Sequence, residues 1–183
     1  STGISVMQCK KALEEAGGDT EKALVILRKK SGELSAKKAD RTFGAGIVHA
    51  YVHSTGKVAT MVELVCETDF VSGNADFKTL AHDIAMHIAA ANPKFLNKDE
   101  ITEEVKNTAK EVFMKEVEGK PKEMQDKILE GKLSTYFGEM VLLNQPFIKN
   151  PEMTIEALIA AAVQKFGEKI AIARFTRFAV LEK

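Results

Sequence analysis

Hydrophobic and polar residues alternate along residues 57–66, which predicts a β-strand with one buried face. A second alternating stretch covers residues 47–53, and Ser54, Thr55 and Gly56 between the two stretches predict a turn. We therefore expect an antiparallel hairpin. A third extended segment at residues 169–181 is expected to pair with the hairpin and complete a three-stranded antiparallel sheet. The inward positions of the first stretch are Val58, Thr60, Val62, Leu64 and Cys66.

Helical periodicity dominates the rest of the chain. Residues 76–91 and 154–166 carry apolar side chains at i, i+3 and i+4 spacing, and Asn92-Pro93 and Gly167 end these two helices. Residues 102–143 predict an antiparallel helical pair that projects from the body. Its second helix is expected to begin with Pro121 at its first helical position and to be interrupted at Gly131. The fold class predicted for the whole chain is α+β.

The first part of the chain predicts a small helical module. Residues 7–16 and 19–30 are two short helices separated by Gly17-Gly18, and Asp19 caps the second helix. Two such helices bury little surface alone. The pattern resembles a ubiquitin-associated-like three-helix bundle whose first helix would precede Ser1. We divide the chain into this module at residues 1–31, a linker at 32–42 and a core domain at 43–183.

The linker is polar, and its cations leave two interpretations open. Lys37, Lys38 and Arg41 either belong to a solvated connection or contact an acidic partner. The same holds for the helical pair at residues 102–143, whose contact with a partner the pattern does not decide.

A short connection follows the strongest strand. Glu67 and Thr68 come directly after it, and a turn-forming Ser-Gly-Asn cluster at residues 72–74 precedes the next helix. Asp69 and Phe70 are therefore expected between a rigid strand and a rigid helix. They either form a contact tip, or Asp69 begins a turn and Phe70 folds back into the core.

Composition narrows the class of partner. The chain has 26 Lys and Arg against 26 Asp and Glu, and a neutral total argues against direct nucleic-acid binding. Apolar runs are too short for a membrane span, and no signal peptide opens the chain. Cys9 and Cys66 lie in different contexts and are expected to be buried thiols, which fits a reducing, cytoplasmic location.

Catalytic motifs are not found in the sequence. There is no P-loop, G-x-G-x-x-G, G-x-S-x-G or pair of carboxylates on one predicted face. His49 and His53 on one strand would lie roughly 13 Å apart, too far to share a zinc ion. His82-Asp83 lacks the H-E-x-x-H spacing of a metalloprotease, so surface histidines are favoured over a metal hydrolase. We expect a binding protein with no metal, no cofactor and no covalent or acid–base catalysis.

Several stretches together resemble the elongation factor Ts family. They are MQCKKAL at residues 7–13, CETDFV at 66–71, IAMHIAA at 84–90, QPF at 145–147 and RFTRF at 174–178. The resemblance covers nearly the whole chain and is to the short bacterial form. Residues 3–7 depart from the usual glycine–alanine–glycine run of the family.

The resemblance implies a partner and a mechanism. Such a protein binds elongation factor Tu carrying GDP and promotes GDP release. Asp69 and Phe70 would wedge near the Mg²⁺ and phosphate site of the GTPase, with Thr68 and Val71 shaping the turn. The N-terminal module would dock through a surface around its first helix, and the sheet would contact another domain. The resemblance also implies a homodimer or a 2:2 complex. The implied contact residues outside the turn are Met7, Lys10, Lys11, Leu13 and His53.

A rival interpretation uses only the first 30 residues. A ubiquitin-associated-type adaptor would bind peptides or other proteins without exchange activity. In such an adaptor Asp69 and Phe70 would be dispensable.

Overall fold

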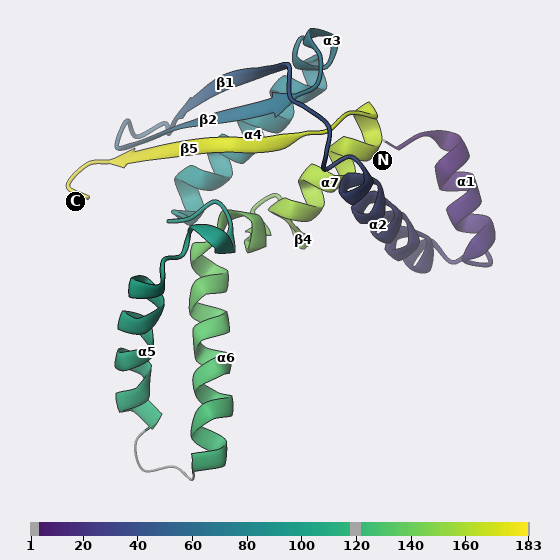
Figure 1. Ribbon diagram of the computed structural model, residues 1–183. Coiled ribbons are helices and arrows are strands. Elements are labelled where there is room, and N and C mark those ends of the chain that lie inside the picture. The colour runs from purple at the N-terminus through teal and green to yellow at the C-terminus, as the bar shows by residue number, and fades with distance from the viewer. Residues whose placement is uncertain (1–3, 118–121, 183) are drawn as a thin grey trace.

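The computed structural model describes residues 4–117 and 122–182 and has the predicted α+β architecture. Its main sheet contains β1 (Ala45–Val52), β2 (Val58–Cys66) and β5 (Ala171–Ala179) in the order β1-β2-β5 (Figure 1). Both pairings are antiparallel, with Ile47 opposite Leu64 and Val62 opposite Phe175. The predicted hairpin and third strand are confirmed.

The inner face of the sheet packs against helix α4 (Ala75–Ala91). Thr60, Val62, Leu64 and Cys66 on β2 are buried as their spacing predicts, and Thr60 Oγ1 donates to the Ala85 carbonyl at 2.8 Å. The Asn74 side chain caps the start of α4, and Asn92 ends it in the left-handed conformation. The core therefore lies between the sheet and α4.

Helix α7 (Ile155–Phe166) adds a second helix to the core. The Thr154 hydroxyl caps its start, and Gly167 ends it with a φ of 73°. The sequence pattern did not predict the small sheet before it, formed by β3 (Pro146–Phe147) and β4 (Asn150–Thr154). Phe147 from this sheet is buried in the core.

The predicted helical pair projects from the body (Figure 1). It consists of α5 (Glu103–Val117) and α6 (Lys122–Met140), with short 3₁₀ turns η1 (Lys98–Glu100) and η2 (Leu142–Asn144) near its base. The predicted interruption at Gly131 is wrong, because α6 passes through it unbroken. A glycine costs a helix only about 1 kcal/mol, and contacts such as Phe113 against Tyr136 hold the pair together. The expectation for Pro121 lies outside the described residues.

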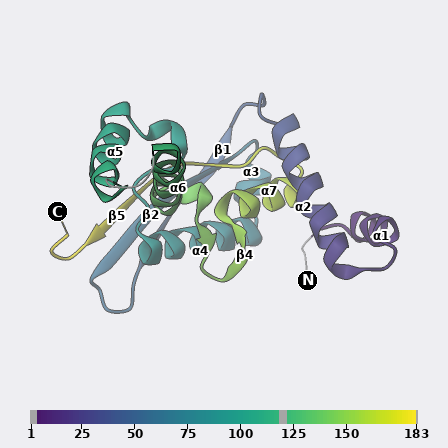
Figure 2. The same cartoon turned by 90° about the horizontal axis from the view of Figure 1, so that it is seen from below.

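The N-terminal segment contains α1 (Val6–Glu15) and α2 (Thr20–Lys37), with the Asp19 carboxylate capping α2 as predicted. Helix α2 was expected to end at residue 30 and instead continues to Lys37, so half of the expected linker is helical. Ser31, directly before this segment, and Lys38 within it are buried, but most other residues of 32–42 are exposed, so the segment is solvated only in part. The reason is distant in sequence: α2 lies alongside α7, and Ser31 Oγ donates to Gln164 of that helix (Figures 1 and 2).

In the described parts of the chain, no helix combines the length and the apolar character that a membrane span needs.

Candidate functional site

The segment after β2 is one turn of helix, α3 (Asp69–Ser72), rather than an irregular turn. Thr68 is still extended, and the helix starts at the next residue. The Ser72 N–H donates to the Thr68 carbonyl at 3.2 Å, and the Gly73 N–H donates to that of Asp69 at 2.9 Å. Helix α4 begins three residues after α3 ends, so the turn is fixed between a strand and a long helix.

Two neighbouring side chains of α3 lie in different environments. Phe70 is 84% exposed, whereas Val71 is 3% exposed and belongs to the main core cluster. Successive side chains of a helix lie about 100° apart, so burying Val71 turns Phe70 outward. The interpretation in which Phe70 folds back into the core is therefore wrong, and Val71 is the residue that anchors the turn. We call the exposed pair Asp69 and Phe70 the tip.

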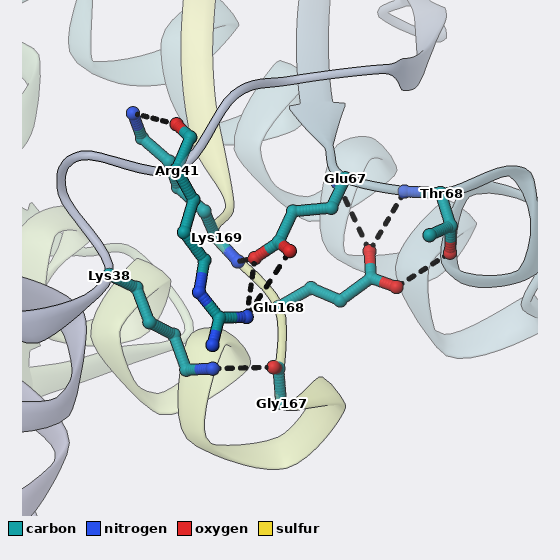
Figure 3. Close-up of polar contacts among 7 residues, drawn as sticks. All are labelled: Lys38, Arg41, Glu67, Thr68, Gly167, Glu168 and Lys169. Carbon is teal, nitrogen blue, oxygen red and sulfur yellow. Dashed lines mark hydrogen bonds and ion pairs between the residues drawn. The ribbon is translucent and has the colours of Figure 1, made fainter.

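A carboxylate from a distant segment holds the residues before the tip (Figure 3). Glu168 Oε2 accepts the main-chain N–H groups of Glu67 at 3.1 Å and Thr68 at 3.0 Å. Its Oε1 accepts the Thr68 hydroxyl at 2.6 Å. Three hydrogen bonds donated to one carboxylate thus fix the point at which β2 becomes α3.

Glu67 in turn accepts a hydrogen bond from the segment that carries Glu168. Its carboxylate accepts the main-chain N–H of Lys169 at 2.5 Å, and Arg41 Nη1 lies 3.2 Å from both of its oxygens. The Lys169 hydrogen bond and the Arg41 guanidinium lower the pKa of Glu67 below its usual 4.5. This contribution to stability is complete above about pH 4.5 and is lost as the pH falls through the folded-state value.

Two lysines donate hydrogen bonds to main-chain carbonyl groups close to Glu67 and Glu168 (Figure 3). Lys169 Nζ donates to the carbonyls of Ala39 at 2.6 Å and Arg41 at 2.8 Å, and the buried Lys38 Nζ donates to that of Gly167 at 2.7 Å. Lys37, by contrast, is exposed at the end of α2. Of the linker cations, Lys38 and Arg41 thus make internal contacts.

Close backbone packing completes the support. The Gly44 N–H donates to the Cys66 carbonyl, and a Cβ at Gly44 would lie 2.7 Å from the Glu67 carbonyl oxygen. Glycine is therefore required at this position. Burial, with a contribution from the nearby Glu168 carboxylate, raises the pKa of the Cys66 thiol, whose Sγ lies 3.3 Å from the Thr68 carbonyl. Cys66 is thus a protonated structural thiol, and Cys9 is half-buried.

The predicted contact residues of the N-terminal module are exposed residues of α1. Met7 and Leu13 are exposed apolar side chains, and Lys10 and Lys11 lie beside them in the same helix. The buried side of α1 instead presents Ala12 to Leu27 of α2. Helical spacing places Met7, Lys10 and Lys11 on one side of α1 and Leu13, which is 37% exposed, closer to the buried side.

His53 lies at the opposite end of the sheet from the tip. It follows the last residue of β1, and its Nδ1 is 3.1 Å from the Tyr51 hydroxyl. The tip follows the last residue of β2, which pairs with the first residue of β1. The length of an eight-residue strand, roughly 25 Å, separates them. The structure does not bring His53 and the tip together.

The remaining histidines have partners of their own. His49 Nε2 lies 3.1 Å from His82 Nδ1, and Asp83 binds Lys149 Nζ at 2.6 Å. His87 is buried and bonded to Gln145 and the Ile148 main chain. Within residues 4–117 and 122–182, no three His, Cys, Asp or Glu side chains are placed to hold a metal ion.

Comparison with known proteins shows the family. A family model described as elongation factor TS matches residues 5–182. The chain is 49% identical to elongation factor Ts of Thermodesulfovibrio yellowstonii over 180 residues, which is 98% of this chain and 90% of that protein. It is 46% identical to that of Carboxydothermus hydrogenoformans (97% of this chain, 82% of that protein) and 45% identical to that of Syntrophus aciditrophicus (100% and 92%).

The chain belongs to the elongation factor Ts family. It is a nucleotide exchange factor for elongation factor Tu and acts by binding rather than by chemical catalysis. An adaptor that uses only the first 30 residues does not account for a family match over residues 5–182, so that alternative is wrong.

In this elongation factor Ts, hydrogen bonds to a distant segment hold the residues directly before the tip. Asp69 and Phe70 could be predicted from the sequence, but their supports Glu168, Glu67 and Lys169 could not. Glu168 lies 100 positions after Thr68, so no local spacing connects them. The one available signal was weak: a carboxylate directly after Gly167, which ends a helix beside the last strand.

Proposed function

We propose that the tip of this elongation factor Ts enters the GTPase domain of elongation factor Tu and displaces the elements that hold Mg²⁺ and the phosphates of GDP. Phe70 supplies the wedge and Asp69 the polar contact beside it. Thr68 and Val71 hold the turn from below. No group of this chain reacts with the nucleotide.

The exposure of Phe70 on a fixed turn is the observation that carries this proposal. A large ring that is 84% exposed gains about 1.5–3 kcal/mol when a partner buries it. Val71 in the core and the three bonds to Glu168 hold the turn before binding. Little ordering is then needed on contact, so most of the gain is available for binding.

The energetics of exchange are those of two linked binding events. Elongation factor Ts lowers the affinity of elongation factor Tu for GDP by a certain ratio. GDP lowers the affinity of elongation factor Tu for elongation factor Ts by the same ratio. A thousandfold weakening corresponds to about 4 kcal/mol. One buried hot spot can supply free energy of that size.

Contacts away from the tip hold the partner in place. In this proposal a module of residues 1–31 docks on the GTPase domain through Met7, Lys10, Lys11 and Leu13, whose exposure leaves them open to a partner. Residues 32–42 lead from it to a core of residues 43–183. His53, at the far end of the sheet, contacts another domain, so the partner spans the length of the sheet.

We further propose that two copies associate in the cytoplasm as a homodimer, giving a 2:2 complex with elongation factor Tu. Val48, Val52, Met61 and Phe178 are exposed on the sheet face opposite α4. A second copy would cover this apolar face and remove it from water.

The test is release of a fluorescent GDP analogue from elongation factor Tu in the presence of excess unlabelled GDP. Wild type and two control variants, Asp126→Ala and Leu181→Ala, should accelerate release at catalytic concentrations. These controls remove an exposed carboxylate from α6 and an exposed apolar side chain near the end of the described chain.

Asp69→Ala and Phe70→Ala should each reduce the acceleration, Phe70→Ala by about thirtyfold, which is the loss of a 2 kcal/mol hot spot. If both variants accelerate release as well as wild type, the wedge is wrong and exchange depends on another surface of the chain.

A further inference from the structure

Thr68 is the residue at which the chain changes from strand to helix, and its polar groups are all engaged. Its N–H and hydroxyl donate to Glu168, and its carbonyl accepts the N–H of Ser72. Although Thr68 is the N-cap of α3, its hydroxyl does not cap that helix. The hydroxyl that would ordinarily bond the helix is used instead to hold a distant carboxylate.

The contact is reciprocal between two segments. Glu168 accepts N–H groups of residues 67 and 68, and Glu67 accepts the N–H of Lys169. We call these two carboxylates and the three N–H groups the carboxylate clasp (Figure 3). Hydrogen bonds to ionised acceptors are about twice as strong as neutral ones. The clasp thus fixes the end of β2 against the turn between α7 and β5.

We propose that Glu168 is a positioning residue for nucleotide exchange: it sets the direction in which α3 presents Asp69 and Phe70. The inference rests on the proposed function, in which the tip is the exchange element. Glu168 acts on the main chain and hydroxyl of Thr68, directly before the tip. Rotation about the Thr68 backbone would swing the tip as a unit, and the clasp prevents it.

The number and reach of the Glu168 hydrogen bonds predict which substitutions keep the function. Glu168→Gln retains an oxygen for the two N–H groups, and its amide can donate to the Thr68 hydroxyl. Glu168→Asp is shorter by one methylene and cannot reach, and Glu168→Ala loses all three bonds. The expected order of activity is therefore wild type, then Gln, with Asp and Ala well below.

The experiment measures kcat and KM for GDP release from elongation factor Tu, together with hydrogen exchange of the Thr68 amide. Glu168→Ala and Glu168→Asp should lower kcat about tenfold, since small misplacements of a working group cost this much or more, with KM changed less than about twofold. Their Thr68 amide should exchange faster. Glu168→Gln should restore protection and keep kcat within about threefold of wild type.

Matched variants separate positioning from other roles. Glu152→Ala removes an exposed carboxylate from β4 and should change neither readout. A rise in KM with constant kcat would show that Glu168 contacts the partner directly and would overturn the inference. If Glu168→Ala is unfolded at the assay temperature, the folded Asp variant decides the question.

Phe70→Ala measured alongside distinguishes the two proposals. Loss of kcat in Phe70→Ala, with normal kcat in Glu168→Ala despite an unprotected Thr68 amide, overturns the positioning role alone. Normal kcat in both variants overturns the proposed function of the tip. Continued protection of Thr68 in Glu168→Ala shows that the clasp does not hold the turn and overturns the positioning role.

Discussion

Phe70 and Val71 are neighbours in different environments, because Phe70 is exposed to solvent and Val71 belongs to the core. Phe70→Ala removes a ring that is already in water, so the free energy of unfolding should change by less than about 0.5 kcal/mol. Val71→Ala opens a small cavity in the core and should cost about 2 kcal/mol. Chemical denaturation measures both losses.

The exchange assay should give the reverse order for these two variants. Phe70→Ala should lose most of the acceleration of GDP release, whereas Val71→Ala, which weakens only the anchor of the turn, should lose a smaller part of it at temperatures where it is folded. Equal losses of activity in the two variants would contradict the separation of wedge from anchor.

His87 makes the stability of the fold sensitive to pH. The main-chain N–H of Ile148 donates to its Nδ1 at 3.3 Å, so the proton lies on Nε2, which donates to Gln145 Oε1 at 3.0 Å. Burial lowers the pKa of His87 below 6.5, and the Gln145 hydrogen bond partly opposes this. The folded state therefore keeps the ring neutral at pH values where the unfolded chain binds a proton.

The contribution of the neutral His87 ring to stability should be complete above pH 6.5, the ordinary pKa of histidine. It should fall as the pH drops below that value, until the ring of the folded protein is also protonated. One such group gives a slope of at most about 1.4 kcal/mol per pH unit. Urea denaturation between about pH 5 and 8 measures it. His87→Gln should be less stable at pH 8 but show a shallower slope, with a remainder from His49, whose pKa burial and His82 also lower. An unchanged slope in His87→Gln would assign the pH dependence to other groups.

At the scale of single residues, local spacing predicted which apolar residues of a strand or helix are buried. It did not predict which polar residues are buried or what their hydrogen-bond partners are. The inward positions of β2 follow from alternation alone, because a strand turns successive side chains to opposite faces. The buried positions of Ser31 and Lys38 do not, because their partners Gln164 and Gly167 come from α7, more than a hundred residues away.

Two glycines show how position in an element decides the effect of one substitution. Gly131 lies inside α6 with ordinary helical φ, and a Cβ there would meet open space. Gly131→Ala should therefore stabilise the protein by about 0.5–1 kcal/mol. Gly167 ends α7 with a φ of 73°, and Gly167→Ala should destabilise by about 1 kcal/mol despite equal space around it.

Thermal unfolding of these two variants measures both effects at once. Opposite signs are expected, because the side chain gained is the same and only the backbone conformation differs. A destabilising Gly131→Ala would favour the interruption of the helix at Gly131 that the sequence predicted.

The sequence predicted whether a segment is a helix or a strand better than it predicted where each helix or strand ends. Caps such as Asp19, Asn74 and Thr154 are local signals and place the starts of α2, α4 and α7 to within about a residue. The end of α2 at Lys37 has no such signal, since packing against α7 extends it past Lys30. The two-residue strand β3 is too short to give a period.

At the scale of the molecule, α7 connects the N-terminal helices with the tip. Gln164 Nε2 donates to Gln8 of α1 at 3.1 Å, and Ser31 of α2 bonds to the same side chain. Gly167 follows Gln164 by three residues, and its carbonyl accepts a hydrogen bond from the Lys38 ammonium. The next residue, Glu168, accepts the N–H of Thr68. The two surfaces assigned to the GTPase domain are therefore braced against the same helix, which is why the polar segment between them is not a free tether.

The outer face of the main sheet, opposite α4, is the surface through which we expect two copies to associate. Met61 lies at its centre, opposite Ala50 on one side and Thr176 on the other, and the Glu63–Arg174 ion pair at 2.6 Å lies beside it. Phe178 is 69% exposed near the end of β5. The exposed face therefore combines apolar side chains with a charged pair on the central and last strands, and a second copy could bury the apolar side chains.

Wild type should therefore sediment as a dimer at micromolar concentration, with a melting temperature that rises with protein concentration. Met61→Glu would bring two carboxylates together at the centre of a two-fold interface and should weaken the dimer at least about a hundredfold, since unpaired buried charges cost several kcal/mol. Val25→Glu, an equal change at an exposed apolar position of α2, should leave the mass unchanged. A wild-type monomer at high concentration, or equal masses for wild type and Met61→Glu, would show that the sheet face does not bind a second copy.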